Sequence, residues 1–397
     1  MQHLKNNFMY GKAIDVDGNP LSNVSLAYGD GQYAFTDSDG YWHIDNLKKG
    51  DLLVVSKPNY HFVPKTIEVH SKDVETVFIG HSHSHLSKDD KVFQWVNDRQ
   101  LDNGLITSND TSDLVSLYDN ALLAIAYVSK KEWAYAERIF DFFESKRSLE
   151  LEKGDGGFFQ FRNREGENGR RTWLGDNAWL LIAIRQYHEA TQNQKYAQLQ
   201  QSLERWIRNQ QDSDGGLWGG LNENGQQIHK VTEGIITAFL AIEGYDTFHK
   251  DILRYLRAHR WDSHKRTLIA WPENPKYTYA LDLHPLGHGI LEAYPVTALE
   301  LAEMYRCTKI ATVTGNEMTG YCFDEDKDVI WLEGTAQMAV AYKKSGYPAK
   351  SEHRIQEMEK ALIEGAMSTN HLGLPYASNP GTSYGPSTLW EEADLVP

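Results

Sequence analysis

The chain has 397 residues, which is long for a single domain, so we expect two. Its net charge of −15 argues against nucleic acid and anionic membranes as partners, because both are bound through basic patches. No apolar run is long enough for a transmembrane helix, and Cys307 and Cys322 are too few to predict a disulfide framework. The first residues lack the apolar core of a signal peptide, so we expect a cytoplasmic protein, or a secreted or cell-surface one if such a peptide has been removed.

Residues 1–80 have the pattern of a small β-sandwich. Short alternations of apolar and polar residues are separated by turn residues, which predicts an antiparallel sandwich. The turns Asp17-Gly18-Asn19-Pro20 and Asp37-Ser38-Asp39-Gly40 resemble those of the carboxypeptidase regulatory-like family. That resemblance implies a transthyretin-like, seven-stranded module without catalytic residues. The aspartates could bind calcium, but we favour ordinary turn chemistry for them.

Residues 81–88 are predicted to link this sandwich to the rest of the chain. They begin with three alternating histidines, His81, His83 and His85. A strand would place all three on one face, where they could hold a metal ion. A polar linker is the interpretation that we favour, so no metal site is predicted.

Residues 89–397 have a helical pattern in which buried and exposed helices alternate. The segments 113–127 and 175–188 are apolar on nearly all sides, which is typical of buried helices. The segments 133–146, 194–210 and 351–364 carry charge on one side and should lie outside. This alternation predicts two concentric rings of helices.

Acidic residues open the predicted inner helices, or the loops before them, at intervals of about 50 to 57 residues. One repeated acid could be an N-cap, because an Asp side chain accepts hydrogen bonds from free N–H groups. Acids at equivalent ends of five inner helices would instead converge around the axis of a toroid. These five are Asp119, Asp176, Glu233, Asp282 and Glu333.

The motifs around these acids resemble the six-hairpin glycosidase superfamily over roughly residues 90–397. They are Tyr118-Asp119-Asn120, Gly175-Asp176-Asn177, Thr232-Glu233-Gly234 and Trp331-Leu332-Glu333-Gly334. The resemblance implies an (α/α)6-type toroid acting on sugars. Relatives are expected to have Thr-Glu-His-Asn where this chain has Gly234-Ile235 after Thr232-Glu233. By the repeat, a sixth inner helix would open near residues 383–390. Too few residues follow before Pro397 for such a helix, so the toroid is predicted to lack its last inner helix.

Glycoside hydrolysis needs one protonated and one ionised carboxyl group. We predict Glu233 as the general acid and Asp176 as the base, with Asp119 and Glu333 as alternates. Aromatic rings near the acids would stack on sugar, and Asn177 and His284 are added as polar contacts. His284 and His288 could bind zinc, but Pro285 between them disfavours that geometry. The aromatic candidates are Tyr118, Trp173, Trp218, Trp271 and Trp331.

The sequence thus predicts a carbohydrate-active protein, a probable glycoside hydrolase, acting on a poly- or oligosaccharide as a monomer without a cofactor. A non-catalytic carbohydrate-binding or scaffold protein with the same fold is one alternative. A terpene-cyclase-like toroid is another, because residues 210–218 are similar to the Gln-Trp repeats of those enzymes. The Asp-rich motif on which terpene cyclases depend is not found in a matching setting.

Overall fold

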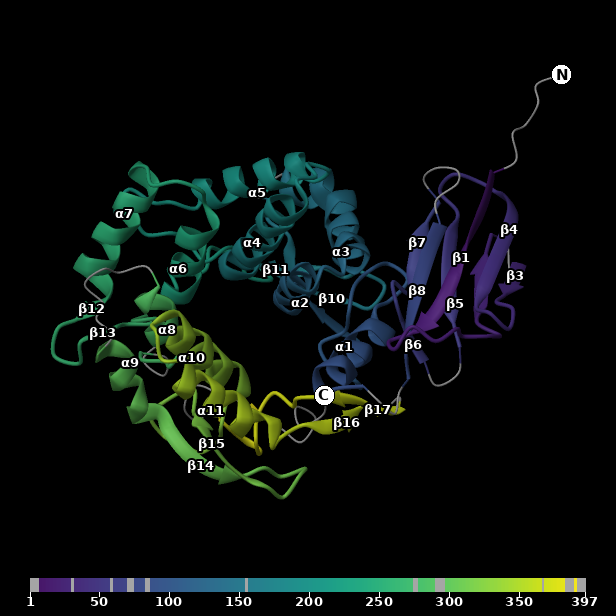
Figure 1. The fold of residues 1–397 in the computed structure, drawn as a ribbon. Helices are drawn as coiled ribbons and strands as arrows, with labels where there is room; N and C mark the ends of the chain where they lie inside the picture. Colours follow the sequence, from purple (N-terminus) through teal and green to yellow (C-terminus); the bar gives the residue numbers. More distant parts are fainter. Residues whose placement is uncertain are drawn as a thin grey trace. The chain divides into compact units, whose positions relative to one another are not determined.

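The computed structural model describes residues 7–29, 32–57, 60–69, 75–82, 86–153, 156–273, 278–289, 297–365, 368–382 and 389–390. Contacts between residues divide the chain into two compact units, Met1–Gln94 and Trp95–Pro397. The first unit consists of β-sheets and the second is mainly helical (Figure 1).

The first unit is a sandwich of two four-stranded sheets with the orders β4-β1-β8-β6 and β3-β2-β5-β7. Strand β1 pairs antiparallel with β4 but parallel with β8, so the prediction of a purely antiparallel sandwich is wrong at this pair. The described strands also number eight, whereas the family resemblance implied seven. Their bounds are Asn7–Asp15 (β1), Ser25–Tyr28 (β2), Gln32–Phe35 (β3), Tyr41–Leu47 (β4), Leu52–Ser56 (β5), Tyr60–Val63 (β6), Thr66–Glu68 (β7) and Glu75–Ser82 (β8).

Alternate side chains of both sheets fill the sandwich core, as the period of a strand requires. Its largest members include Trp42, Leu53 and Phe78, which are almost completely buried. The aspartates of the turns act locally. The carboxylate of Asp15 accepts N–H groups from Asp17 and Asn19, as ordinary turn chemistry predicts.

The predicted linker overlaps the sandwich, because His81 and Ser82 belong to strand β8. The ring of His81 lies 6.3 Å from that of His61 on the neighbouring strand β6. His83 and His85 lie outside the described residues. Helix α1 then begins at Lys88.

In the second unit, each inner helix contacts the next inner helix along the chain: α2 with α4, α4 with α6, α6 with α8 and α8 with α10. The helices between them lie outside, as predicted. The inner helices are α2 (Leu117–Lys130), α4 (Leu174–Thr191), α6 (Thr232–Ala241), α8 (Leu283–His288) and α10 (Leu332–Lys344). The outer helices are α1 (Lys88–Arg99), α3 (Trp133–Lys146), α5 (Ala197–Asn209), α7 (Thr247–Tyr255), α9 (Thr297–Leu301) and α11 (Pro348–Glu359).

Most of the region where a sixth inner helix would open, residues 383–390, lies outside the described residues. After α11, the described residues form strands and no further helix (Figure 1). Strands β16 (Ile363–Gly365) and β17 (Ser368–Gly373) lie against α1: Gly365 abuts the ring of Trp95, and His371 pairs with Asp98 at 3.1 Å. The helix predicted over 351–364 therefore ends earlier, at Glu359. The remaining short strands are β18 (Gly381–Thr382) and β19 (Leu389–Trp390).

Three further pairings arrange the loops around the inner helices. Strands β9 (Leu114–Ser116), β10 (Phe159–Asn163) and β11 (Arg170–Thr172) form one small sheet, and β9 leads directly into α2. Strands β12 (Trp261–Asp262) and β13 (Thr267–Leu268) form a second, and β14 (Arg306–Ile310) and β15 (Glu317–Tyr321) a third. Within the described ranges, no helix is both long enough and apolar enough to cross a membrane.

Candidate active site

The acids at the starts of the inner helices make no side-chain cap bonds, although Asp282 occupies the N-cap position of α8. The N-cap of α2 is Ser116, whose hydroxyl accepts the N–H of Asp119. The N-caps of α4, α6 and α10 are Trp173, Val231 and Trp331, and none of these makes a side-chain cap bond. Capping therefore does not explain why an acid recurs at these helix starts.

The amides beside two of the acids have a structural task. Asn120 and Asn177 are fully buried, and each donates to the carbonyl four residues earlier, at Ser116 and Trp173. Each amide also exchanges hydrogen bonds with both backbone groups of one loop residue, which is Ile106 for Asn120 and Phe158 for Asn177. Asn177 thus fixes a loop to the helix start, which disagrees with the prediction that it contacts substrate.

The buried position of these two asparagines also accounts for Ile235, which stands where relatives are expected to have asparagine. Ile235 lies four residues after the N-cap of α6, where α2 and α4 have Asn120 and Asn177. Its side chain is fully buried. The asparagine expected in relatives would therefore occupy a loop-fixing position, and its absence removes no polar group from the site surface.

Two glycines bring the starts of α4 and α6 together. A Cβ at Gly234 would lie 3.3 Å from the backbone nitrogen of Gly175, and one at Gly175 would lie 2.8 Å from the carboxylate of Glu233. The lack of a side chain at both positions favours this close approach of the two helix ends. Glu233 is thereby held against the turn that carries Asp176.

The five acids form one electrostatic cluster, which we call the acid ring: Asp119, Asp176, Glu233, Asp282 and Glu333. Burial raises the pKa of Asp176 well above its usual range, and the charge of Glu233 raises it further, against a hydrogen bond from Gln160. Burial, followed by the charges of Glu233 and Glu333, raises the pKa of Asp282 to about 8. The predicted convergence of the five acids is therefore observed in their mutual interactions.

The other members of the acid ring differ in which contacts oppose the rise in their pKa. Burial raises the pKa of Asp119 to about 6, against a hydrogen bond with Ser108. Burial also raises the pKa of Glu233, but Thr237 and Trp179 oppose it, and the Thr237 hydroxyl lies 2.9 Å from its Oε1. The hydrogen bond from Thr237 thus favours the ionised form of Glu233.

Glu333 joins the two ends of the series of inner helices. Its Oε1 accepts hydrogen bonds from the hydroxyl of Tyr118 on α2 and from the amide of Gln337, the latter at 3.1 Å. Burial raises the pKa of Glu333 to about 7, the Tyr118 hydrogen bond opposes this, and the charges of Asp119 and Glu233 add to it.

Exposure separates the acid ring into two groups. Asp176 and Asp282 are only 4% and 5% exposed. Asp119, Glu233 and Glu333 remain partly exposed. Asp176 and Asp282 can shift the pKa values of neighbouring acids, whereas Asp119, Glu233 and Glu333 can contact a bound molecule.

The predicted aromatic candidates lie at the helix starts but not all of them can contact a ligand. Tyr118 is partly exposed and meets Trp179 edge-on at 6.3 Å. Trp173 and Trp218 are also partly exposed, with the guanidinium of Arg171 4.4 Å from the first ring and the ammonium of Lys230 4.9 Å from the second.

The remaining predicted ligand contacts, Trp271, Trp331 and His284, also differ in exposure. Trp271 is partly exposed and follows Ala270, whose carbonyl binds the first N–H of α6. Trp331 is buried against Phe323, with the ring centres 5.0 Å apart, and supports the wall of the site instead of contacting a ligand. His284 is also buried, edge-on to Tyr305 and 3.4 Å from the hydroxyl of Thr267, so it belongs to the core.

Two residues of the site were missed from the sequence. Asp282 was noted only as a helix opener, although its pKa is strongly coupled to the acid ring. Tyr376 is 48% exposed, and its proximity to Tyr118 contributes to raising the pKa of that phenol after burial and Glu333. The loop carrying it lies on the start of α10, since its carbonyl accepts the N–H of Leu332. The available signal was the segment Gly373-Leu374-Pro375-Tyr376, a further loop in which the sequence resembles the six-hairpin glycosidase superfamily.

Among the described residues, one group of His, Cys, Asp and Glu side chains is close enough to hold a metal ion: Cys322, Asp326 and Asp328. It contains no member of the acid ring. His284 and His288, considered above for zinc, are not part of such a group.

The second unit has the fold of α/α toroid enzymes. An α-amylase from Clostridium perfringens superposes with a TM-score of 0.55 at 11% identity, covering 78% of this chain and 93% of its own. Cellobiose 2-epimerase from Bacillus thermoamylovorans gives 0.54 at 12% identity, covering 76% and 93%. A glycosidase solved in complex with glucose gives 0.50 at 10% identity, covering 76% and 86%.

At these identities the likeness concerns the fold alone. No protein-family model matches the sequence, and no curated protein matches it either. The resemblance of the first unit to the carboxypeptidase regulatory-like family therefore stays a prediction.

Proposed function

We propose that this protein is a glycoside hydrolase that cleaves a poly- or oligosaccharide with a pair of carboxyl groups. The observation that carries the proposal is the acid ring, in which three partly exposed carboxyl groups differ in what stabilises their protons. Glycosidic cleavage needs one carboxyl group that donates a proton and one that stays ionised. A helix cap or a core hydrogen bond needs neither.

We assign the general acid to Glu333. Both of its side-chain hydrogen bonds, from Tyr118 and Gln337, fall on Oε1. A proton on this carboxyl group therefore sits on Oε2, from which it can be donated. With a pKa of about 7, the group keeps that proton at neutral pH and can release it during the reaction.

Glu233 is the ionised partner in this scheme. Its carboxylate faces the hydroxyl of Thr237 and interacts with Trp179, and both contacts favour the charged form. As a base it would activate water, and as a nucleophile it would attack the sugar directly. Asp176, which the sequence suggested as the base, is too buried to touch substrate and acts by keeping its own proton beside Glu233.

Leaving-group dependence tests this division of roles. Glu333→Gln should lower turnover of an oligosaccharide by roughly 100-fold or more, but far less on dinitrophenyl glycosides, whose leaving group needs no proton. Glu233→Gln should lower turnover of both substrates. A panel of gluco-, manno- and galacto-configured substrates, with reducing ends and dinitrophenol both measured, covers the unknown sugar.

The matched control is Glu317→Gln, an exposed glutamate on β15 that lies outside the acid ring. It should behave like the parent. Equal losses on both substrates for Glu333→Gln would contradict its role as the acid. Binding of glycans without any turnover would instead favour the non-catalytic alternative, and conversion to an epimer would replace hydrolysis as the reaction.

The contacts of residues 210–218 do not favour the terpene-cyclase alternative. Asp212 and Asp214 both bind the ammonium group of Lys230, at 2.7 and 2.8 Å. This contact with Lys230 lowers the pKa of Asp212, so the carboxylates are committed to an ion pair and poorly suited to donate a proton to an olefin.

A further inference from the structure

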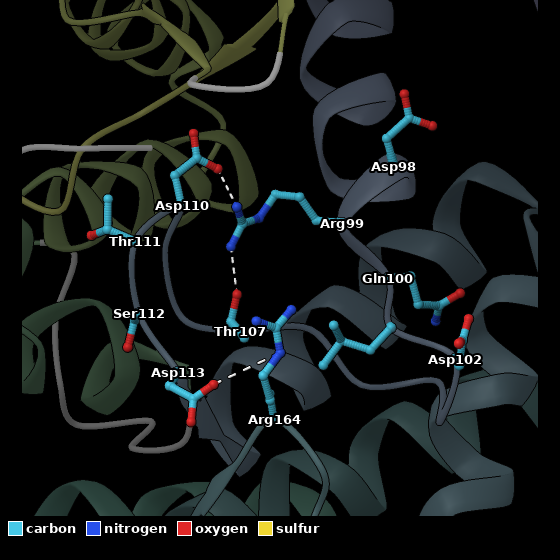
Figure 2. A pocket seen from close by; sticks show the side chains of 11 residues that line it. Asp98, Arg99, Gln100, Asp102, Thr107, Asp110, Thr111, Ser112, Asp113 and Arg164 are labelled. Carbon is cyan, nitrogen blue, oxygen red and sulfur yellow. Dashed lines mark hydrogen bonds and ion pairs between the residues drawn. The ribbon is translucent and has the colours of Figure 1, made fainter.

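A polar cavity of about 480 Å³ lies between the end of α1, the loop before β9 and the turn joining β10 to β11 (Figure 2). Its volume is in the range of pockets that bind small organic ligands. It belongs wholly to the second unit. The residues that carry the argument are Asp98, Arg99, Thr107, Asp110, Asp113 and Arg164.

The wall of this cavity is built around a buried ion pair. The Arg99 and Asp110 side chains are 6% and 1% exposed and form a direct hydrogen bond. The second guanidinium nitrogen of Arg99 donates to the hydroxyl of Thr107 and to the carbonyl of Asn109. These bonds fix the loop, so the cavity is preformed instead of being created by a ligand.

The rim is different, because its charged groups are exposed. Arg164 and Asp113 face one another at 3.7 Å, with side chains 54% and 66% exposed (Figure 2). An exposed pair at this distance contributes little to stability. Each group can therefore exchange its partner for a ligand at small cost.

Both walls continue into segments that hold the acid ring. Thr107 lines the cavity, and its neighbour Ser108 is close enough to Asp119 to lower the pKa of that carboxyl group. Arg164 follows strand β10, whose Gln160 lowers the pKa of Asp176 in the same way. A sugar chain whose cleaved bond lies at the acid ring could thus extend along these segments to the cavity.

We propose that this cavity binds an uncharged sugar residue of the substrate, with Arg164 and Asp113 as the specificity-determining contacts. A guanidinium donor beside a carboxylate acceptor matches neighbouring hydroxyl groups, which donate and accept in turn. Four aspartates and two arginines line the cavity, so an acidic sugar would be repelled. The inference rests on the proposed function for the identity of its ligand.

The test uses the full chain carrying Glu233→Gln, so that substrates remain intact, and measures binding by calorimetry. The probes are gluco-, manno- and galacto-oligosaccharides of increasing length, with oligogalacturonides as acidic counterparts. Arg164→Ala and Asp113→Asn should each weaken binding of the longer neutral chains by roughly tenfold, the loss of one or two charged hydrogen bonds. The shortest bound chains should be unaffected.

Arg254→Ala is the matched control, because Arg254 is 64% exposed, pairs with Asp251 and lies on the outer helix α7. Parental affinity of the Arg164 and Asp113 variants at every chain length would overturn the inference, as would tighter binding of oligogalacturonides or no binding of any probe. If the parent hydrolyses a substrate and Arg164→Ala binds and hydrolyses it equally well, the role of the cavity is refuted but the proposed reaction is not. Loss of affinity in that variant without any hydrolysis would refute the proposed reaction and retain the cavity.

Discussion

Acidic residues lie at the ends of structural elements in both units, but under opposite physical conditions. In the sandwich, Asp15 at the end of β1 is partly exposed, and hydrogen bonds from Asn19 and the turn backbone lower its pKa. In the toroid, the acid ring is enclosed, receives few compensating donors, and has raised pKa values. An acid that stabilises its own turn is thus satisfied by local N–H groups, whereas an acid available for proton transfer is not.

The comparison predicts where activity depends on pH. Because the pKa of Glu333 is about 7, the proton that it donates is lost as the pH rises above this value. Turnover of oligosaccharides should then fall, by roughly 100-fold between pH 7 and pH 9, since each pH unit reduces the protonated fraction tenfold. A rate profile measures this directly. An alkaline limb that persists unchanged in Glu333→Gln would show that another group is responsible.

Replacing one acid in each unit sharpens the contrast. Asp119→Asn removes a negative charge that, after burial, helps to raise the pKa of Glu333. The alkaline limb should therefore move to lower pH, and turnover at neutral pH should fall by roughly tenfold. Asp15→Asn, at the turn after β1, should leave the rate profile unchanged. The comparison fails if both substitutions shift the limb equally, or if neither does.

The asparagines provide a third contrast, within the toroid. Asn177→Ala should lower the free energy of unfolding by about 1–3 kcal/mol, because Phe158 is buried and both of its backbone groups lose a partner. Asn120→Ala should behave similarly through Ile106. Chemical denaturation measures both effects. A parental midpoint for either variant would mean that its loop is held by other contacts.

Much of the fold could be predicted because its signals are local. The helix Trp133–Lys146 has the predicted bounds, since a one-sided charge pattern marks it. The parallel pairing of β1 with β8 joins distant segments and leaves no local signal. Residues 363–364 were predicted as the end of a helix but belong to strand β16. This strand packs against α1, which is distant in the sequence, so no local pattern indicates it.

The candidate site was predictable in its members but not in their roles. The spacing of the acids placed them at equivalent helix ends. Which acid is exposed depends on neighbours such as Gly175 and Tyr118, which belong to other helices. Thr232 illustrates the limit: its type suggests an N-cap, but its hydroxyl donates to the carbonyl of Ile269 and Val231 occupies the cap position.

The smallest expected effect concerns the stability of the acid ring itself. Burial raises the pKa of Asp282 to about 8, above the ordinary value of an aspartate. The folded state therefore holds this proton more tightly than the unfolded state does, so its contribution is full at pH 4 and is lost as the pH rises toward 8. The melting temperature should fall over this range, and Asp282→Asn should flatten the decline by roughly 3 °C or more. Asp15, whose pKa is lowered, has the opposite sign: it contributes above its unfolded pKa and loses that contribution in acid, so Asp15→Asn should alter the curve only at the acid end. Parallel curves for the parent and Asp282→Asn between pH 4 and pH 8 would mean that Asp282 is ionised in the folded protein, and the contrast between the two units would then not extend to this residue.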